Sequence, residues 1–233
     1  VEVNQGAPMV AYKEAFKQTV EHREVLKKQS GGRGKFADIV FEIGPADQEW
    51  LTENPGKSFQ FVNDLFGGSI PKEFVPAITK GFENAMTNGV LANYPMVDMK
   101  IRVFDGSYHD VDSDAMSFEL CAKSGFREAG RKAKPTLLEP IMKVEVVTPD
   151  QYMGDVTGDL NRRRGMLEGM DTKGNAQVIR AKVPLSEMFG YVTQLRSLSS
   201  GRATSTMEFS HYAPAPNNIA EEVIAKVKGK VSA

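Results

Sequence analysis

The sequence has little cysteine and no long apolar stretches. Its 233 residues include one cysteine, Cys121, which excludes an internal disulfide framework and predicts a reducing, cytoplasmic environment. No apolar run approaches the roughly 20 residues that cross a bilayer. Residues 1–9 include Glu2 and Asn4 and lack the apolar centre of a signal peptide. We therefore expect a cytoplasmic protein without a membrane partner.

The sequence also lacks an excess of charge of either sign. Its 29 Lys and Arg residues oppose 30 Asp and Glu residues, giving a net charge of −1. A free-standing nucleic-acid binder normally carries clustered positive charge, so DNA is not an expected partner. Local basic clusters nevertheless remain around residues 27–35, 127–134 and 162–164. The neutral average therefore still permits local contacts with phosphate groups.

Motifs for catalysis, metal binding and nucleotide binding are missing as well. The sequence contains no G-x-x-x-x-G-K-[ST] phosphate loop, no His-x-x-x-His pair and no cysteine pair. We expect no catalytic residue, metal site or cofactor within this chain. The chain begins with Val1 instead of methionine, so we expect a fragment of a longer protein.

The length fits two small domains divided near Pro135. A helix is predicted to end at residues 131–134, and Pro135 prevents its simple continuation. The predicted domains, 1–134 and 135–233, carry net charges of −2 and +1. Neither half is an acidic or basic tail.

The second half follows a regular alternation of strands and helices. Apolar residues recur at every second position over 142–146, 179–183 and 203–209, and a short strand is predicted over 166–170. Helices are predicted over 155–164 and over 186–199, with Ser186 as N-cap of the second. The order βαββαβ predicts a ferredoxin-like sandwich. A terminal helix over 218–228 is appended.

The first half predicts an α+β domain of less regular order. Strands are expected over 37–43, 59–64 and 97–103, a helix from Pro76, and a second helix over 113–130. Trp50 and Leu51 fall in an expected loop. Both halves together give an α+β fold with two domains.

One loop before the strand at residue 37 is rich in glycine. It comprises Gln29, Ser30, Gly31, Gly32, Arg33 and Gly34. Glycines allow the backbone to approach a flat partner closely, and Arg33 can form charge-assisted bonds to phosphate. A flexible hairpin connection and an enzyme's phosphate loop are the alternatives. The enzyme reading is disfavoured because the segment leads into a strand instead of a helix.

A second polar loop follows the strand at residues 97–103. It contains Ser107, Tyr108, His109, Asp110, Val111 and Asp112. Tyr108 can stack on a base, and His109 can donate a hydrogen bond to phosphate or a 2′-hydroxyl. An ordinary exposed histidine, with Ser113 capping the next helix, is the alternative reading.

Six segments resemble elongation factor G, in that family's order. In the first half they are residues 28–34 (KQSGGRG), 67–77 (GGSIPKEFVPA) and 106–113 (GSYHDVDS). In the second half they are residues 138–146 (LEPIMKVEV), 158–165 (GDLNRRRG) and 183–191 (VPLSEMFGY). The resemblance covers nearly the whole chain.

The resemblance implies domain identities and sites. Residues 1–134 would be the family's domain IV, with an unusual left-handed βαβ crossover, and 135–233 its domain V with the C-terminal helix. The two loops would form the tip of domain IV that binds RNA and tRNA. His109 matches a tip histidine that is modified in eukaryotic and archaeal relatives. The arginine run Arg162, Arg163 and Arg164 would contact ribosomal RNA, with a solvated helix end as the alternative.

The resemblance also implies a mechanical role in protein biosynthesis. The full-length protein would be a ribosome-stimulated GTPase that binds GTP and Mg in an N-terminal domain missing from this chain. Its partners would be the ribosome, tRNA and mRNA, with domain IV in the decoding region and domain V near the GTPase-associated centre of the large subunit. A paralogue specialised for ribosome recycling and a small phosphate-binding enzyme are the alternatives.

Overall fold

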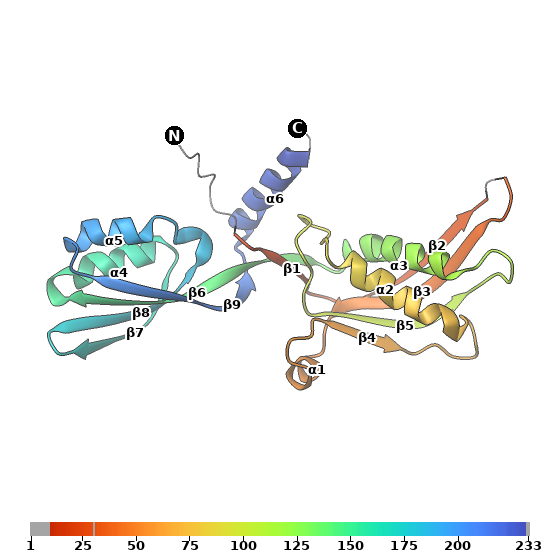
Figure 1. Ribbon diagram of the computed structural model, residues 1–233, viewed down its shortest axis with the longest axis horizontal. Helices are drawn as coiled ribbons and strands as arrows, with labels where there is room; N and C mark the ends of the chain where they lie inside the picture. The colour runs from red at the N-terminus through yellow and green to blue at the C-terminus, as the bar shows by residue number, and fades with distance from the viewer. Residues whose placement is uncertain (1–9, 30, 232–233) are drawn as a thin grey trace, which may run out of the picture. The chain divides into compact units, whose positions relative to one another are not determined.

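The computed structural model describes residues 10–29 and 31–231, which divide into two compact units (Figure 1). One unit joins Lys13–Leu137 to Ala215–Ala233, and the other joins Leu138–Pro214 to the start of the chain up to Tyr12. The C-terminal helix therefore belongs to the first unit, whereas the sequence division placed it with the second half. A backbone bond from Ala215 N to Leu137 O, 2.9 Å long, ties the start of this segment to the first unit.

The unit containing Lys13–Leu137 is a four-stranded sheet with helices on one face. The sheet order is β2-β3-β5-β4, and its strands are β2 (Val20–Lys28), β3 (Lys35–Pro45), β4 (Phe59–Asn63) and β5 (Met99–Ser107). Among the four strands of this sheet, only β4 and β5 pair in parallel, and α2 (Val75–Ala85) lies between them in sequence. This pair is the βαβ unit for which the resemblance implies a left-handed crossover. The remaining elements are β1 (Lys13–Phe16), α1 (Gln48–Glu53), α3 (Ala115–Gly130) and α6 (Asn217–Val231).

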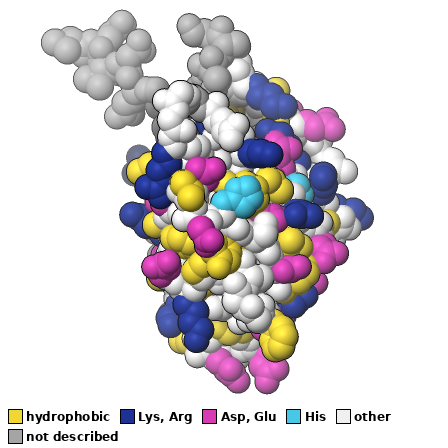
Figure 2. All heavy atoms as spheres, turned by 90° about the vertical axis from the view of Figure 1, so that its right-hand side faces the viewer, with side chains coloured by type: hydrophobic (Ala, Val, Ile, Leu, Met, Phe, Trp, Pro, Cys, Tyr) yellow, Lys and Arg dark blue, Asp and Glu magenta, His cyan; other side chains and the backbone are white. Residues whose placement is uncertain are grey.

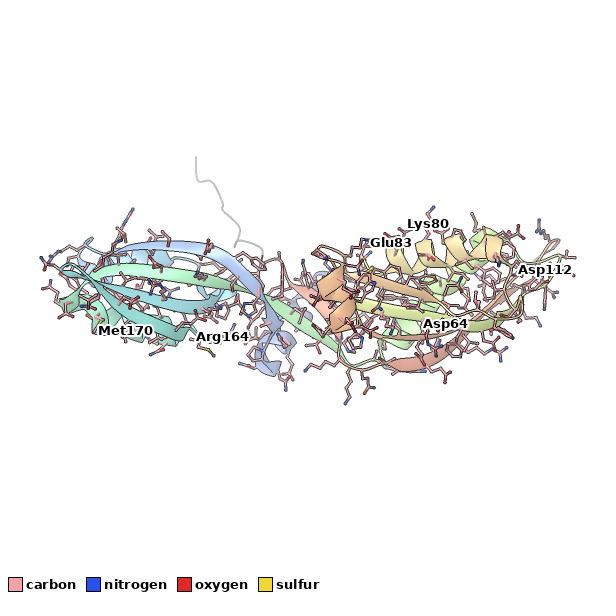
Figure 3. All side chains as sticks on the ribbon, turned by 90° about the horizontal axis from the view of Figure 1, so that it is seen from below. Asp64, Lys80, Glu83, Asp112, Arg164 and Met170 are labelled. Atoms are coloured by element: carbon pink, nitrogen blue, oxygen red, sulfur yellow. The ribbon has the colours of Figure 1, made fainter. Side chains whose placement is uncertain are left out.

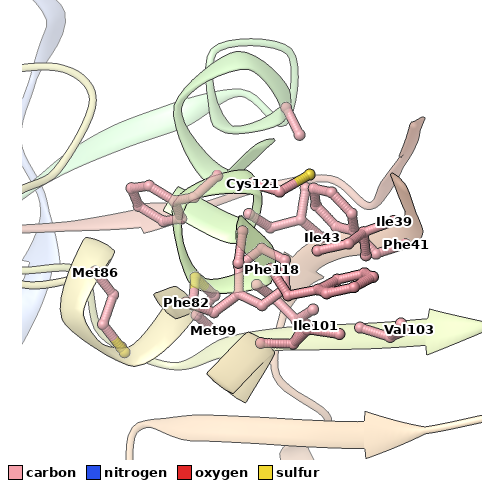
Figure 4. Close-up of a cluster of buried hydrophobic side chains, with 14 of the residues drawn as sticks. Ile39, Phe41, Ile43, Phe82, Met86, Met99, Ile101, Val103, Phe118 and Cys121 are labelled. Atoms are coloured by element: carbon pink, nitrogen blue, oxygen red, sulfur yellow. The ribbon is translucent and has the colours of Figure 1, made fainter. Parts of the chain in front are cut away.

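The core of this unit lies between the sheet and helices α2 and α3 (Figure 4). Alternate residues of β3 and β5, including Phe41, point toward the helices and are fully buried. There they pack against Phe82 of α2 and Phe118 of α3. The rings of Phe41 and Phe82 meet edge to face with centroids 4.9 Å apart. Period-two burial on the strands and a stripe on each helix thus build one contiguous core.

The other unit is a ferredoxin-like sandwich, as predicted. Among the strands of this unit, β6 pairs with β8 and β9, and β7 pairs with β8, and all three pairs are antiparallel. The elements are β6 (Pro135–Pro149), α4 (Met153–Arg162), β7 (Met166–Lys173), β8 (Ala176–Pro184), α5 (Tyr191–Ser199) and β9 (Thr204–Pro214). Both helices pack on Val144, Val146 and Ile179 in the core.

Several local expectations were wrong. Strand β2 was not predicted, because its inward positions include the polar His22 and Glu24, which mask the apolar period. Trp50 lies in α1 instead of a loop. Ser186 does not cap α5: a 3₁₀ turn intervenes at Leu185–Glu187, and Gly190, with φ of 74°, takes the N-cap position. In the described part of the chain, no helix is long and apolar enough to cross a membrane.

Candidate nucleic-acid interface

The two predicted loops leave the same end of the β2-β3-β5 sheet. β3 pairs with β2 up to Lys28–Lys35 and with β5 up to Asp38–Ser107, so the loops 29–34 and 107–113 emerge beside each other. Figure 3 labels Asp112 at that end of the unit. Ser30 lies outside the described residues. We call the described residues of these two loops, together with Phe36, the tip.

Three hydrogen bonds tie the two loops of the tip together. Phe36 N donates to Asp112 O over 2.9 Å, and Arg33 Nε donates to Val111 O over 2.8 Å. Ser113 Oγ donates to Phe36 O over 2.8 Å. These hydrogen bonds hold the two loops together. The Arg33 side chain is one of the donors, so it is bound within the tip.

The imidazole of His109 is exposed and lies flat against Phe36. The ring centroids are 3.7 Å apart and the rings are 4° from parallel. The backbone N–H of His109 donates to Ser113 Oγ over 3.0 Å, which holds the loop closed behind the ring. The position of the ring is therefore fixed while its edge remains accessible. Tyr108 and Val111 are exposed beside it, at 40% and 70%.

Sequence reasoning missed Phe36 and assigned Ser113 the wrong role. Asp114 is the N-cap of α3, and its carboxylate accepts from Ser117 N over 2.7 Å. The hydroxyl of Ser117 donates to the same carboxylate, and the two bonds from Ser117 are the main reason that the pKa of Asp114 lies below its ordinary value. The hydroxyl of Ser113 therefore does not cap the helix and forms the bonds to Phe36 and His109 that hold the two loops together. The available signal was the aromatic residue at position 36, two positions after the glycine-rich loop ends.

The base of the tip is fixed by a buried carboxylate. Asp38 is 1% exposed and accepts both guanidinium bonds of Arg23, at 2.9 and 2.7 Å, and a bond from Ser107 Oγ at 2.6 Å. Burial raises the pKa of Asp38, but the bonds from Arg23 and Ser107 outweigh it, so the net shift is downward. A Cβ at Gly106 would lie 2.3 Å from Asp38 O, so only glycine allows this approach.

The glycines of the first loop have two different functions. Gly31 and Gly32 have φ of 40° and 145°, and a Cβ added at either would meet nothing within 4 Å, so they supply backbone conformation. A Cβ at Gly34 would lie 2.9 Å from Lys28 O, so this glycine supplies close packing. The loop leads into a strand, as the sequence indicated.

Charge at the tip is mixed. Lys27 and Lys28, which end strand β2 next to the first loop, are exposed, while Asp110 is exposed and Asp112 half-buried in the second loop. Figure 2, which faces this end of the unit, shows basic, acidic and apolar side chains interspersed with a histidine at the surface. The tip therefore offers shape, ring faces and backbone donors instead of a broad basic face.

Two of the three arginines at 162–164 are bound within their own unit, and one is exposed. Arg164 forms two bonds of 2.9 Å with the carboxylate of Glu139, which is only 4% exposed, and a third of 3.2 Å with Glu187. Arg163 bonds to Asp159 and lies over the ring of Tyr191. Only Arg162, 72% exposed, is accessible. Arg164 is labelled in Figure 3.

Among residues 10–29 and 31–231, no cluster of three or more His, Cys, Asp or Glu side chains has the arrangement of a metal site. Cys121 is buried, and burial, followed by the charge of Glu24, raises the pKa of its thiol to about 12. The thiol is therefore a small buried hydrophobe.

The fold and the site together define a class of protein. Its members have two α+β domains: one is ferredoxin-like, and the other ends in two exposed loops that are hydrogen-bonded to each other. Family models sharpen this class. Residues 8–134 match the model of elongation factor G, domain IV, and residues 136–223 match that of the elongation factor G C-terminus. The chain belongs to the elongation factor G family.

Individual relatives agree with this family. The chain is 62% identical to elongation factor G of Cytophaga hutchinsonii and 58% identical to that of Amoebophilus asiaticus, each over 98% of its length. A crystal structure of a protein from Thermus thermophilus matches 96% of the chain with a TM-score of 0.82 and 36% identity. The chain spans 32% of the length of each of these three proteins.

Proposed function

We propose that this chain is the part of a translational GTPase that promotes ribosomal translocation of tRNA and mRNA. The observation that carries the proposal is the tip, where an exposed imidazole is held flat on Phe36 by loops that are bonded to each other. Single-stranded and looped RNA is recognised by stacking and by bonds to base edges, phosphates and 2′-hydroxyls. Tyr108, His109 and the glycine backbone offer these groups.

The proposed RNA-binding residues are those predicted from the sequence: Gln29, Ser30, Gly31, Gly32, Arg33, Gly34, Ser107, Tyr108, His109, Asp110, Val111 and Asp112. In this role the tip occupies the decoding region of the ribosome and prevents tRNA and mRNA from slipping back. Since Arg33 is bonded to Val111 O, it supports the loop, and His109 and Tyr108 make the contacts.

The two units have different partners in this proposal. The unit with the tip contacts tRNA and mRNA, as domain IV, and the ferredoxin-like unit contacts large-subunit ribosomal RNA, as domain V. Arg162 is the accessible member of its arginine run for that contact. GTP and Mg bind in a domain outside this chain, and the whole protein works in the cytoplasm. This chain alone carries no GTP hydrolysis.

The test is His109→Ala in the full-length factor. The substitution removes the ring that faces RNA, and the lost stack on Phe36 costs only about 0.5–1.5 kcal/mol of stability. We expect slower tRNA–mRNA translocation in a single-round assay, with ribosome-stimulated GTP turnover largely retained.

His211→Ala is the matched control, because His211 is an exposed histidine in the ferredoxin-like unit. It should leave both rates unchanged. Equal loss of translocation and GTP turnover in His109→Ala would contradict the tip role. Retained translocation with impaired ribosome recycling would favour a recycling paralogue.

A further inference from the structure

A polar hollow of about 280 Å³ lies beside the C-terminal end of α3, in the unit that carries the tip. It is lined by the loop that follows α2 and by the last turn of α3: Asn88, Gly89, Val90, Asn93, Arg127 and Arg131. A Cβ at Gly130 would lie 3.1 Å from Val90 Cγ1, so this glycine lets the loop and the helix approach closely. None of these residues belongs to the tip.

The loop side of the hollow is held in place by a buried carboxylate. Glu14 is fully buried and accepts bonds from the backbone N–H groups of Leu91, Ala92 and Tyr94, at 2.8, 3.1 and 2.9 Å. Gly89 is required beside it, because a Cβ there would lie 2.3 Å from the Glu14 carboxyl carbon. The two asparagines are therefore presented by a preorganised loop.

The helix side supplies two guanidinium groups with spare donors. No described residue forms an ion pair or hydrogen bond with the Arg127 side chain. Arg131 pairs with Glu128 over 3.3 Å, with side chains 65% and 54% exposed, and such an exposed pair is weak. The dipole of α3 explains why arginines lie at its C-terminal end, but it leaves their donors unused.

We propose that this hollow binds a phosphodiester group of an RNA backbone. Two guanidinium groups match the charge and fork geometry of phosphate oxygens. The amides of Asn88 and Asn93 add neutral donors suited to phosphate and sugar oxygens, which position a protein on RNA without reading sequence. The proposal rests on the proposed function, since it adds a second RNA contact to the unit that carries the tip.

The experiment measures binding of the 233-residue chain to an octauridylate at several salt concentrations. Each phosphate neutralised on a single strand contributes about 0.7 to the slope of log K against log salt. Because the hollow holds one phosphate, Arg127→Gln with Arg131→Gln should lower the slope by about 0.7, and Arg127→Lys with Arg131→Lys should largely preserve it. Lys80→Gln with Lys123→Gln changes net charge equally on α2 and α3 and should leave the slope unchanged.

Two outcomes would overturn the proposal. Equal loss of slope in both glutamine pairs would mean general electrostatic attraction. If inorganic phosphate, at matched phosphate concentration, shifted the NMR signals of the two arginine Nε–H groups as strongly as octauridylate, the site would be one for free phosphate. Either outcome leaves the His109→Ala test intact, so failure here is distinguishable from failure of the proposed function.

Discussion

The tip and the arginine run at 162–164 both look basic in sequence. In each region, however, most arginine side chains form hydrogen bonds within their own unit and are not free to bind RNA. In the run, Arg163 and Arg164 are taken up by acids and carbonyls of their own unit. At the tip, Arg33 is bonded to Val111 O, while the histidine ring remains outside. An arginine is therefore available to a partner only where no acid or carbonyl of its own unit, near or far in sequence, already accepts its hydrogen bonds.

The proposed contact with RNA does not require the chain, which has a net charge of −1, to carry an excess of positive charge. Its proposed contacts use ring faces, backbone donors and a few accessible guanidinium groups. Sequence-independent contacts position a protein on RNA, and shape supplies the rest.

The largest effect is expected from Arg164→Met. Arg164 compensates Glu139, which is 4% exposed, so removing the guanidinium leaves a buried charge without its partner. We expect the ferredoxin-like unit to lose about 3–5 kcal/mol of unfolding free energy. Urea unfolding followed by a probe in that unit measures the change.

Arg162→Met is the matched control, because it makes the same substitution two residues earlier on an exposed side chain. We expect a change within about 0.5 kcal/mol. If the two variants were equally stable, the pair of Arg164 with Glu139 would not be structural, and Arg164 would be as available to a partner as Arg162.

A smaller effect is expected at the base of the tip from Asp38→Asn. The carboxylate is buried and accepts from Arg23 and Ser107, so its loss should cost about 1.5–3 kcal/mol at neutral pH. The folded-state pKa of Asp38 lies below its ordinary value of 3.8. The stabilisation is therefore present above pH 3.8 and is lost as pH falls toward the lower folded-state pKa.

The measurement is the difference in unfolding free energy between Asp38→Asn and the parent chain as a function of pH. It should shrink below pH 3.8, the ordinary pKa of this carboxyl. Asp105→Asn, on the exposed part of the neighbouring strand β5, is the control; it makes the same change of net charge without removing a hydrogen bond to Arg23 and should cost less than Asp38→Asn at neutral pH. A difference for Asp38→Asn that stays constant through the acid range would contradict the ion pair.

The sequence predicted the periodic parts of both units and the loops of the tip, because alternation and glycine spacing are local signals. The ferredoxin-like order followed from the alternating residues of β6, β8 and β9. Long-range features could not be read in this way. The stack of Phe36 on His109, the clamp by Ser113 and the pair of Arg164 with Glu139 each join residues 25 to 77 positions apart.

Burial explains the remaining misses. Strand β2 has His22 and Glu24 on its inward side, where they bond to each other over 2.7 Å, so the strand lacks a clean apolar period. The role of Ser113 depends on Asp114, which takes the cap of α3 because its carboxylate reaches Ser117 N. Ser113 instead donates its hydroxyl to Phe36 O, a tertiary bond that the local sequence does not reveal.

The central claim is that the tip meets RNA on the ribosome, and a cross-linking experiment tests it most directly. Val111, 70% exposed in the tip, and Met170, 52% exposed in the ferredoxin-like unit, are each replaced by cysteine in a full-length factor without other accessible cysteines and labelled with a short photo-cross-linker. The buried thiol of Cys121 should remain unlabelled. We predict that position 111 cross-links to tRNA, mRNA or decoding-region RNA and that position 170 does not. The absence of cross-links from position 111, or cross-links from position 170 to the same RNA targets, would contradict the proposed role of the tip.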